Sequence, residues 1–427
     1  MLISIALLPI ITPNIWHKHF GKITLVWTKL LIYPMIFYFG FNLTIKELTH
    51  IIIAEYIPFI IILWALFTIT GGIHIKLQYK GHPIINTIIL SIATLSASLI
   101  GTTGAAMLFI RPLILINSWR QYKTHIIIFF IFLVCNIGGA LTAIGDPPLF
   151  MGFILGIDFF WPTKNLLLPF LYMTIPLLIL FIIIDTIFYI KNKTKYKYNT
   201  NNKKIKITGY GNCILLISVI IIIIISGFWK TNIKFNLNNS IIYLEHILRD
   251  TSLLILGFLS LNVIDQSSRK KNFFTWNPLI EVMKLFAGIF ITILPIINII
   301  NQRTEGKFSP IIKLVTNDFN EPINYLYFWI TGILSAFLDN TPTYLIFFHL
   351  AGGDPETLMN NLNKTLITIS TASVFMGALT YIGNAPNFIV KSIAETYNIN
   401  MPSFIGYLCC AIFILGPLLY LIATLFT

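Results

Sequence analysis

Two acidic residues lie inside long apolar stretches of this sequence, and both stand beside residues that break helices. Asp146 directly precedes Pro147-Pro148, and Asp339 directly precedes Asn340-Thr341-Pro342. An ionisable side chain at membrane depth is costly and is typical of a functional site. Burial favours the protonated form of a carboxyl group, whereas a bound cation favours the carboxylate. A carboxyl group in this setting can therefore exchange a proton for a sodium ion.

The helix around Asp146 is expected to unwind. Gly138, Gly139 and Gly145 weaken a helix, and the two prolines after Asp146 remove backbone donors. The freed carbonyl and amide groups are costly in hydrocarbon unless they meet an ion, a ligand or a polar side chain. Oxygen atoms of Thr142, of the freed carbonyls and of Asp146 suit a hard cation such as sodium. The N-termini of the half-helices add partial positive charge that suits an anion.

The same segment recurs 238 positions later in the chain, from Gly139 to Gly377. GALTAIGDPPLF at 139–150 and GALTYIGNAPNF at 377–388 agree at eight of twelve positions. The same offset aligns Gly101-Thr102-Thr103-Gly104 with Asp339-Asn340-Thr341-Pro342, and it places neutral Asn384 opposite Asp146. A kink that serves only packing is the alternative interpretation. Two matching copies favour a duplicated functional unit.

Composition indicates a membrane protein. The 427 residues are 56% hydrophobic and 11% charged, and the mean hydropathy is +0.82. A soluble protein of this length could not bury so much apolar surface. Stretches long enough to cross a bilayer recur from end to end. They are 22–42, 52–72, 124–155, 166–190, 210–228, 251–265, 278–299, 322–350, 365–397 and 404–426.

The net charge of +13 is explained by loops rather than by nucleic acid. Residues 191–208 carry seven lysines and no acidic residue. Basic loops collect on the cytoplasmic side, and counting spans from this loop puts four others on the same side: 17–22, 74–82, 117–124 and 269–271. No folded basic surface with base-stacking groups is indicated, so a nucleic-acid partner is not expected. Three parts are predicted: an N-terminal half (1–190), a cytoplasmic linker (191–208) and a C-terminal half (209–427).

Residues 84–117 are almost wholly apolar, yet they begin and end at basic loops. A re-entrant hairpin with its tip at Gly101–Gly104 explains this pattern, because irregular backbone at membrane depth is tolerated where it lines a cavity. Two short full spans are the alternative. The second tip, at 339–342, is flanked by loops without a basic excess, so it is expected to open outward. The predicted fold is an all-α polytopic membrane protein with two inverted-topology repeats, each with a re-entrant hairpin and a broken transmembrane helix.

Arg111 is the main cation inside the apolar stretches. Its long side chain can reach the inner face of the membrane while its stem stays in an apolar environment, and this is the favoured interpretation. Pairing with one of the two aspartates is the alternative.

Four stretches of the sequence resemble the ion transporter superfamily. This superfamily includes NhaD-type sodium/proton antiporters, arsenite permeases, citrate transporters and divalent-anion/sodium symporters. These stretches are 101–112, 136–153, 337–348 and 377–388, and with their flanks the resemblance covers about 50–420. It implies a scaffold part that forms a homodimer and a transport part of two hairpins and two broken helices that moves as an elevator.

This sequence departs from the dicarboxylate branch of that superfamily. There, a Ser-Asn-Thr motif at each tip binds sodium and a substrate carboxylate. The tips here are Gly101-Thr102-Thr103 and Asp339-Asn340-Thr341. The first tip lacks both Ser and Asn. The second tip has Asp in place of Ser, and an added acidic residue is what we expect of a cation antiporter.

We therefore predict a sodium/proton antiporter of the bacterial inner membrane, with sodium-coupled transport of citrate or a similar anion as the alternative. The expected partners are sodium ions, protons and lipid, and no cofactor is expected. An intramembrane aspartyl protease is disfavoured, because the first Gly of its GxGD motif is replaced by Ala143 and Asn384 is neutral. Sodium is predicted at Thr142, Asp146, Asp339 and Asn340. The full predicted site is Thr102, Thr103, Asn136, Thr142, Gly145, Asp146, Pro147, Asp339, Asn340, Thr341, Thr380, Gly383, Asn384 and Asn387.

Overall fold

A computed structural model describes residues 1–192, 205–231, 233–237, 240–264, 266–272, 274–301, 313–317 and 321–427. The chain is 78% helical, and eight helices in the described ranges are long and apolar enough to cross a membrane. These spans are Lys18–Phe39, Phe41–Gly71, Pro83–Ile100, Thr124–Leu141, Trp161–Lys191, Tyr210–Phe228, Asn277–Ile297 and Phe404–Phe426. The protein is thus a multi-pass membrane protein.

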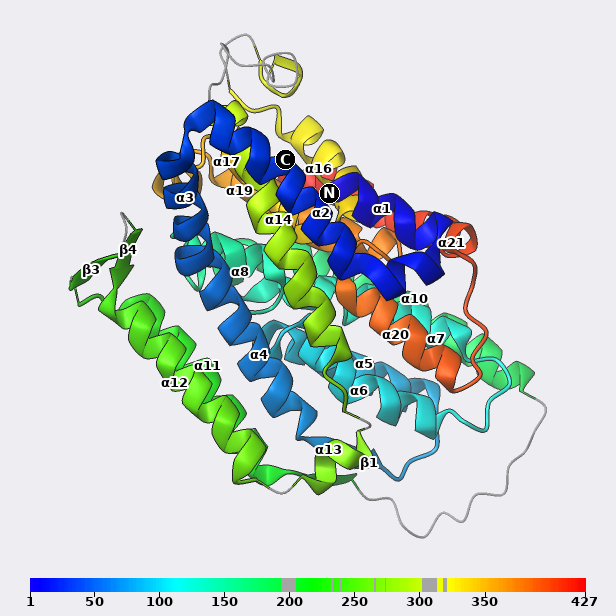
Figure 1. Ribbon diagram of the computed structural model, residues 1–427. Helices are drawn as coiled ribbons and strands as arrows, with labels where there is room; N and C mark the ends of the chain where they lie inside the picture. Colours follow the sequence, from blue (N-terminus) through cyan, green and yellow to red (C-terminus); the bar gives the residue numbers. More distant parts are fainter. Residues whose placement is uncertain are drawn as a thin grey trace.

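The helices divide between the two halves of the chain (Figure 1). The first half contains α1 (Leu2–Ile11), α2 (Pro13–Phe39), α3 (Phe41–His50), the π-helix η1 (Ile51–Tyr56), α4 (Ile57–Gly71), α5 (Pro83–Ile100), α6 (Thr102–Ile116), α7 (Thr124–Leu133), the 3₁₀ helix η2 (Ile137–Leu141), α8 (Pro147–Ile154), α9 (Trp161–Asn165) and α10 (Leu167–Lys191). The second contains α11 (Tyr210–Phe228), α12 (Leu244–Asn262), α13 (Ser267–Lys271), α14 (Asn277–Asn301), α16 (Asn324–Leu338), α17 (Asn340–Leu350), α18 (Pro355–Met359), α19 (Asn363–Met376), η4 (Gly377–Leu379), α20 (Ala385–Thr396) and α21 (Phe404–Phe426).

The chain is mostly helical, in agreement with the predicted all-α class, and it adds two short strand pairs. Strand β1 (His74–Leu77) pairs antiparallel with β2 (Ile205–Thr208), and β3 (Lys234–Leu237) pairs with β4 (Ser240–Tyr243). The first pair lies beside α13 at one end of the molecule, whereas the second lies at the far end of α11 and α12 (Figure 1). Each pair joins connecting segments whose backbone groups have no helix to satisfy them.

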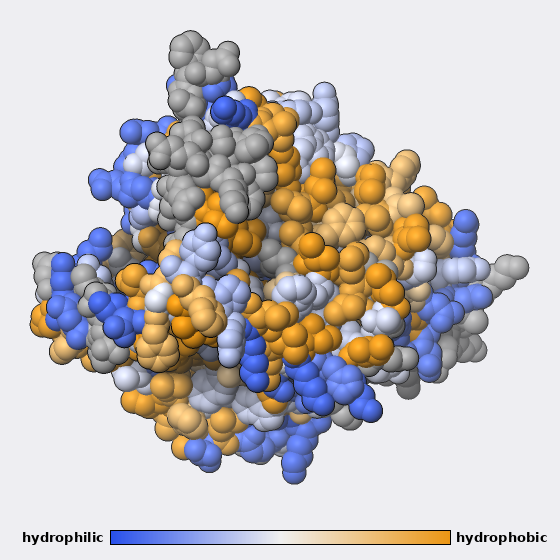
Figure 2. Space-filling model, turned by 45° about the horizontal axis from the view of Figure 1, so that its top comes forward, coloured by the Kyte–Doolittle hydropathy of each residue, from blue (hydrophilic) through white to orange (hydrophobic). Residues whose placement is uncertain are grey.

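Helices α7 and α19 form the centre of the fold. Every residue from Ile126 to Leu133 in α7 is buried, and so is nearly all of α19. Helix α7 is apolar nearly all round, which is typical of an interior helix. Helix α4 packs between α12 and α6 and thereby joins the outer pair α11–α12 to the rest. The surface shows a broad hydrophobic area bordered by hydrophilic groups (Figure 2), as expected for a chain that faces lipid.

One predicted segment differs from the observed one. The predicted loop 17–22 lies within α2, which runs from Pro13 to Phe39 without interruption despite Gly21. The interruptions of 322–350 at Asp339, between α16 and α17, and of 365–397, between η4 and α20, lie at the predicted second tip and second break. The predicted linker 191–208 falls largely outside the described residues.

Candidate functional site

The two predicted hairpin tips have the same backbone conformation. Gly101 joins α5 to α6 with φ 79° and ψ 149°, and Asp339 joins α16 to α17 with φ 78° and ψ 147°. Each of these residues is both the C-cap of one helix and the N-cap of the next. The first residues of the second helices, Thr102 and Asn340, are therefore placed alike in the two halves.

The two helix breaks also match; we call residues 142–146 the first break and residues 380–384 the second break. After η2, Thr142 and Asp146 are extended (φ −141° and −139°), and α8 then begins at Pro147. After η4, Thr380 and Asn384 are extended in the same way (φ −133° and −151°), and α20 begins at Ala385. In each break a threonine hydroxyl donates to a backbone carbonyl of the neighbouring helix pair. Thr142 donates to Ser98 and Thr380 donates to Ala336, which is 238 positions further along.

A glycine is required at one position of each break. A Cβ atom on Gly145 would lie 2.1 Å from the carbonyl oxygen of Gly139, and one on Gly383 would lie 2.5 Å from that of Gly377. The Gly145 carbonyl also accepts a hydrogen bond of 2.8 Å from the N–H of Thr102. This close approach brings the first tip against the first break.

Asp146 is the point at which both halves meet. Its side chain is buried, with 1% of the residue exposed. Thr102 Oγ1 donates to Oδ1 at 2.9 Å, and Asn384 Nδ2 donates to the same oxygen at 3.1 Å. Asn340 Nδ2 donates to Oδ2. One carboxylate thus accepts hydrogen bonds from the first tip, the second tip and the second break.

Helix N-termini supply partial positive charge around Asp146, which offsets part of the cost of burying a carboxylate. Thr102 and Asn340 are the first residues of α6 and α17, while Asp146 and Asn384 are the residues just before α8 and α20. Four helix N-termini therefore meet at one carboxylate. Helix N-termini carry partial positive charge and unpaired N–H groups. A carboxylate at their meeting point would offset this partial positive charge.

Asparagine side chains form a second set of hydrogen bonds that links the segments around the two breaks. Asn136 Nδ2 donates to Asn387 Oδ1 at 2.8 Å, and Asn387 Nδ2 donates to the carbonyls of Gly377 and Thr380 at 2.9 Å. Asn384 Nδ2 also reaches the Cys135 carbonyl at 2.9 Å. These side chains satisfy carbonyl groups that the interrupted helices leave free.

The predicted sodium ligands are not all directed at one point. Asn340 contacts Asp146, but the hydroxyl of Thr142 is directed to Ser98. The carboxylate of Asp339 accepts a hydrogen bond of 3.2 Å from the N–H of Thr341. In the described part of the chain no group of three or more His, Cys, Asp or Glu residues could hold a metal ion.

A cavity of about 300 Å³ borders the second tip and the second break. Asp339, Asn384 and Arg111 line it, together with residues of α14 such as Glu281. The sequence favours an Arg111 side chain that reaches toward the inner face. Arg111 lines this cavity, and its Nη1 atom is buried and has no hydrogen-bond partner among the described residues. The cavity gives the second tip both an acidic and a basic neighbour.

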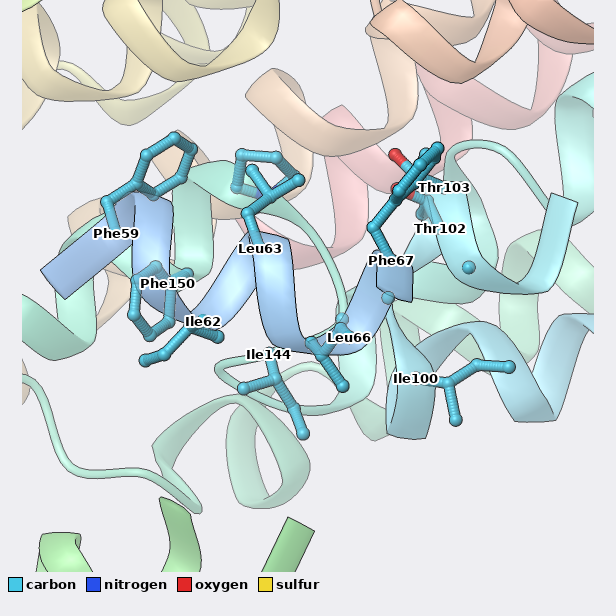
Figure 3. Close-up of a pocket in the computed structure, with 14 residues that line it drawn as sticks. Phe59, Ile62, Leu63, Leu66, Phe67, Ile100, Thr102, Thr103, Ile144 and Phe150 are labelled. Atoms are coloured by element: carbon cyan, nitrogen blue, oxygen red, sulfur yellow. The ribbon is translucent and has the colours of Figure 1, made fainter. Parts of the chain in front are cut away.

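A smaller cavity of about 60 Å³ borders the first tip (Figure 3). Thr102 and Thr103 line it on one side, and Phe59 and Leu63 of α4 line it on the other. Gly145 from the first break and the adjoining Pro147 also border it. The two tips thus face different surroundings, since the described lining of the first cavity has no charged residue, whereas that of the second includes Asp339, Arg111 and Glu281.

A buried charged cluster that sequence reasoning missed lies near the base of α5 and α6. Asp185 of α10 is fully buried and accepts hydrogen bonds from Arg120, from His125 at 2.8 Å and from Asn86 at 2.9 Å. Asn86 is also bonded to Asn117, just after α6, at 3.0 Å. A signal was available, because Asp185 is an acidic residue inside an apolar span.

Comparisons with known proteins agree with a transport role. A family model described as "Putative citrate transport" matches residues 1–427. A search among curated proteins found no match. Since the family model covers the whole length, the two tips and the two breaks all lie within the matched region. The chain belongs to the family that this model describes as "Putative citrate transport".

Proposed function

We propose that this protein is a secondary transporter that exchanges sodium ions for protons at Asp146. The observation that supports this most directly is the convergence of both tips and the second break on one buried carboxylate. A carboxyl group at this depth is stable when it is protonated or bound to a cation. Alternation between these two forms is the minimal chemistry of exchange.

Oxygen atoms that suit sodium surround Asp146. Thr102 supplies a hydroxyl oxygen. Rotation of the amide groups of Asn340 and Asn384 would present oxygen in place of nitrogen, because both atoms lie on the same planar group. Sodium is a hard cation that prefers such ligands. In this proposal the same residues donate to the carboxylate in the absence of sodium and coordinate the ion when it binds.

We further propose that the two halves are inverted-topology repeats and that α5–α6 and α16–α17 are re-entrant hairpins. The matching angles at Gly101 and Asp339, and at the two breaks, support a duplicated unit. In this proposal the hairpins and breaks move as an elevator against a dimeric scaffold that includes α4 and α14. Both helices border the proposed moving part across cavities, which leaves room for sliding.

The exchange is tested with purified protein in proteoliposomes that hold an imposed pH gradient. Addition of sodium should collapse the gradient for the wild type and leave it intact for Asp146→Asn. Asp354→Asn is the matched control, because Asp354 precedes α18 in the connection between α17 and α19, away from the cluster. Sodium-driven proton flux that persists in Asp146→Asn would exclude the proposal.

Sodium-coupled citrate transport is the second candidate, and Arg111 favours it. Arg111 lines a cavity that Asn384 also lines, and one of its nitrogens is buried with no hydrogen-bond partner in the described part of the chain. A guanidinium group is well shaped to bind a carboxylate. Labelled citrate uptake that requires sodium and disappears in Arg111→Gln would establish this candidate. Uptake that is absent from the wild type would exclude it.

A further inference from the structure

A large concave feature lies at one end of the molecule, away from Asp146. It is a cavity of about 880 Å³, which we call the basic cavity. Four lysines line it from three segments: Lys76 and Lys80 in and just after β1, Lys206 of β2 and Lys271 of α13. None of its described lining residues is acidic. The end of α6 forms another wall, with Ser118 and Trp119 just beyond it.

Two of these lysines face each other directly. Lys76 and Lys206 are register partners in the β1–β2 pair, and both are exposed. Like charges at directly opposite positions of an antiparallel pair destabilise it. The bias of basic residues toward one side of a membrane requires lysines in loops, but it does not require them to be paired across strands around one cavity. An anion bound between them would remove the repulsion.

The remaining lining groups suit a phosphate. Thr208 and Ser118 provide hydroxyl donors beside the lysines. Lys80 Nζ lies 4.5 Å from the centre of the Trp119 ring, so its ammonium group is held at the cavity wall by a cation–π contact. Lysine binds phosphate as a point charge, and basic pockets on the cytoplasmic side of membrane proteins bind anionic headgroups.

We propose that the basic cavity binds a phosphate-bearing anion with at least two negative charges. The ligand is either the headgroup of an anionic phospholipid or a soluble polyphosphate. It contacts the β1–β2 pair and α13 on one side and the end of α6 on the other, so it fastens the base of α6 to these elements. This inference does not depend on which ion or substrate the protein transports.

The test measures thermal unfolding of the full-length protein at constant ionic strength. One arm adds pyrophosphate to protein in a neutral detergent, and the other compares nanodiscs of phosphatidylcholine with and without cardiolipin. At a ligand concentration about 100 times Kd, the unfolding temperature should rise by roughly 2–5 °C. A rise with pyrophosphate identifies a soluble ligand, and a rise with cardiolipin alone identifies a lipid headgroup.

The double variant Lys76→Gln/Lys206→Gln should lose this response while unfolding at no lower temperature than the wild type without ligand, because the cross-strand repulsion is gone. The matched control is Lys234→Gln/Lys364→Gln, which removes the same charge from positions outside the basic cavity. A change in tryptophan fluorescence on binding should be lost in Trp119→Phe. The absence of a saturable response in both arms, or an equal loss in the control variant, would overturn the proposal.

Discussion

Asp339 has the backbone conformation of Gly101, although it carries a side chain that this conformation disfavours. The two φ values are 78° and 79°. A residue other than glycine in this region costs about 1–3 kcal/mol. One hydrogen bond from the N–H of Thr341 to the Asp339 carboxylate offsets part of that cost. The strain is thus retained where a carboxylate borders the larger of the two tip cavities.

Replacement of Asp339 should therefore separate stability from transport. Asp339→Gly should raise the free energy of unfolding by about 1 kcal/mol, because glycine adopts this conformation without strain. The same change should reduce sodium/proton exchange, since it removes the carboxylate. Asp339→Asn keeps the strained backbone and should reduce exchange without the gain in stability. Unfolding in detergent measures the change in stability, and flux in proteoliposomes measures transport. Flux at the wild-type level in both variants would show that Asp339 has no part in the exchange.

The hydrogen bond between Asn136 and Asn387 should couple the two breaks energetically. Both residues are fully buried, and removal of either leaves carbonyls or an amide unsatisfied. Asn136→Ala and Asn387→Ala should each lower the free energy of unfolding by about 1–3 kcal/mol. The double variant should lose less than the sum of the two, with a coupling of about 0.5–3 kcal/mol. Additive losses in chemical unfolding would mean that the breaks are stabilised independently.

Gly145→Ala should disrupt the first break, because its Cβ would lie 2.1 Å from the Gly139 carbonyl oxygen. Overpacking of this kind costs about 1–3 kcal/mol or more. Gly416→Ala is the control, since the nearest atom to its Cβ is 3.9 Å away within α21. Replacement of that glycine by alanine should raise the free energy of unfolding by about 0.5–1 kcal/mol, because alanine favours a helix more than glycine does. Equal unfolding temperatures for the two variants would contradict the tight packing at Gly145.

Asp185→Asn should be among the most destabilising single changes near the base of α5 and α6. It leaves the buried Arg120 without its acidic partner, and loss of one member of a buried ion pair costs about 3–5 kcal/mol. Glu395→Gln is the control, because it breaks the partly exposed Lys391–Glu395 pair of α20. An exposed helix pair contributes about 0.3–0.5 kcal/mol. Comparable effects of the two changes on thermal unfolding would show that the Asp185 cluster contributes little to the stability of the fold.

The sequence allowed the helix breaks to be located because their cause is local. Glycine and proline act on the backbone wherever they stand, so the interruption at 142–147 could be predicted from the residues alone. The repeat extended that prediction to the second half. It also predicted that Asn384 occupies the position equivalent to Asp146, and the two side chains are in contact at 3.1 Å.

The direction of individual side chains could not be predicted in the same way. Thr142 was expected to turn toward an ion, but a threonine hydroxyl readily bonds to a nearby carbonyl, and that of Ser98 lies within reach. Pairing of β1 with β2 joins residues as far apart as Lys76 and Lys206, which no local pattern reveals. The Asp185 cluster draws its partners from α5, α7 and the segment before α7, so Asp185 alone gave no indication of them.

The partners of Asp146 also have a consequence for biosynthesis. Asn340 and Asn384 follow Asp146 by 194 and 238 residues. A ribosome adds about 5–20 residues per second, so these amides are made roughly 10–50 s after the carboxyl group. During that interval the nascent N-terminal half has only Thr102 to donate to Asp146 among the three residues. The newly inserted chain therefore carries this carboxyl group protonated or in contact with water until the second half is translated and docks against it.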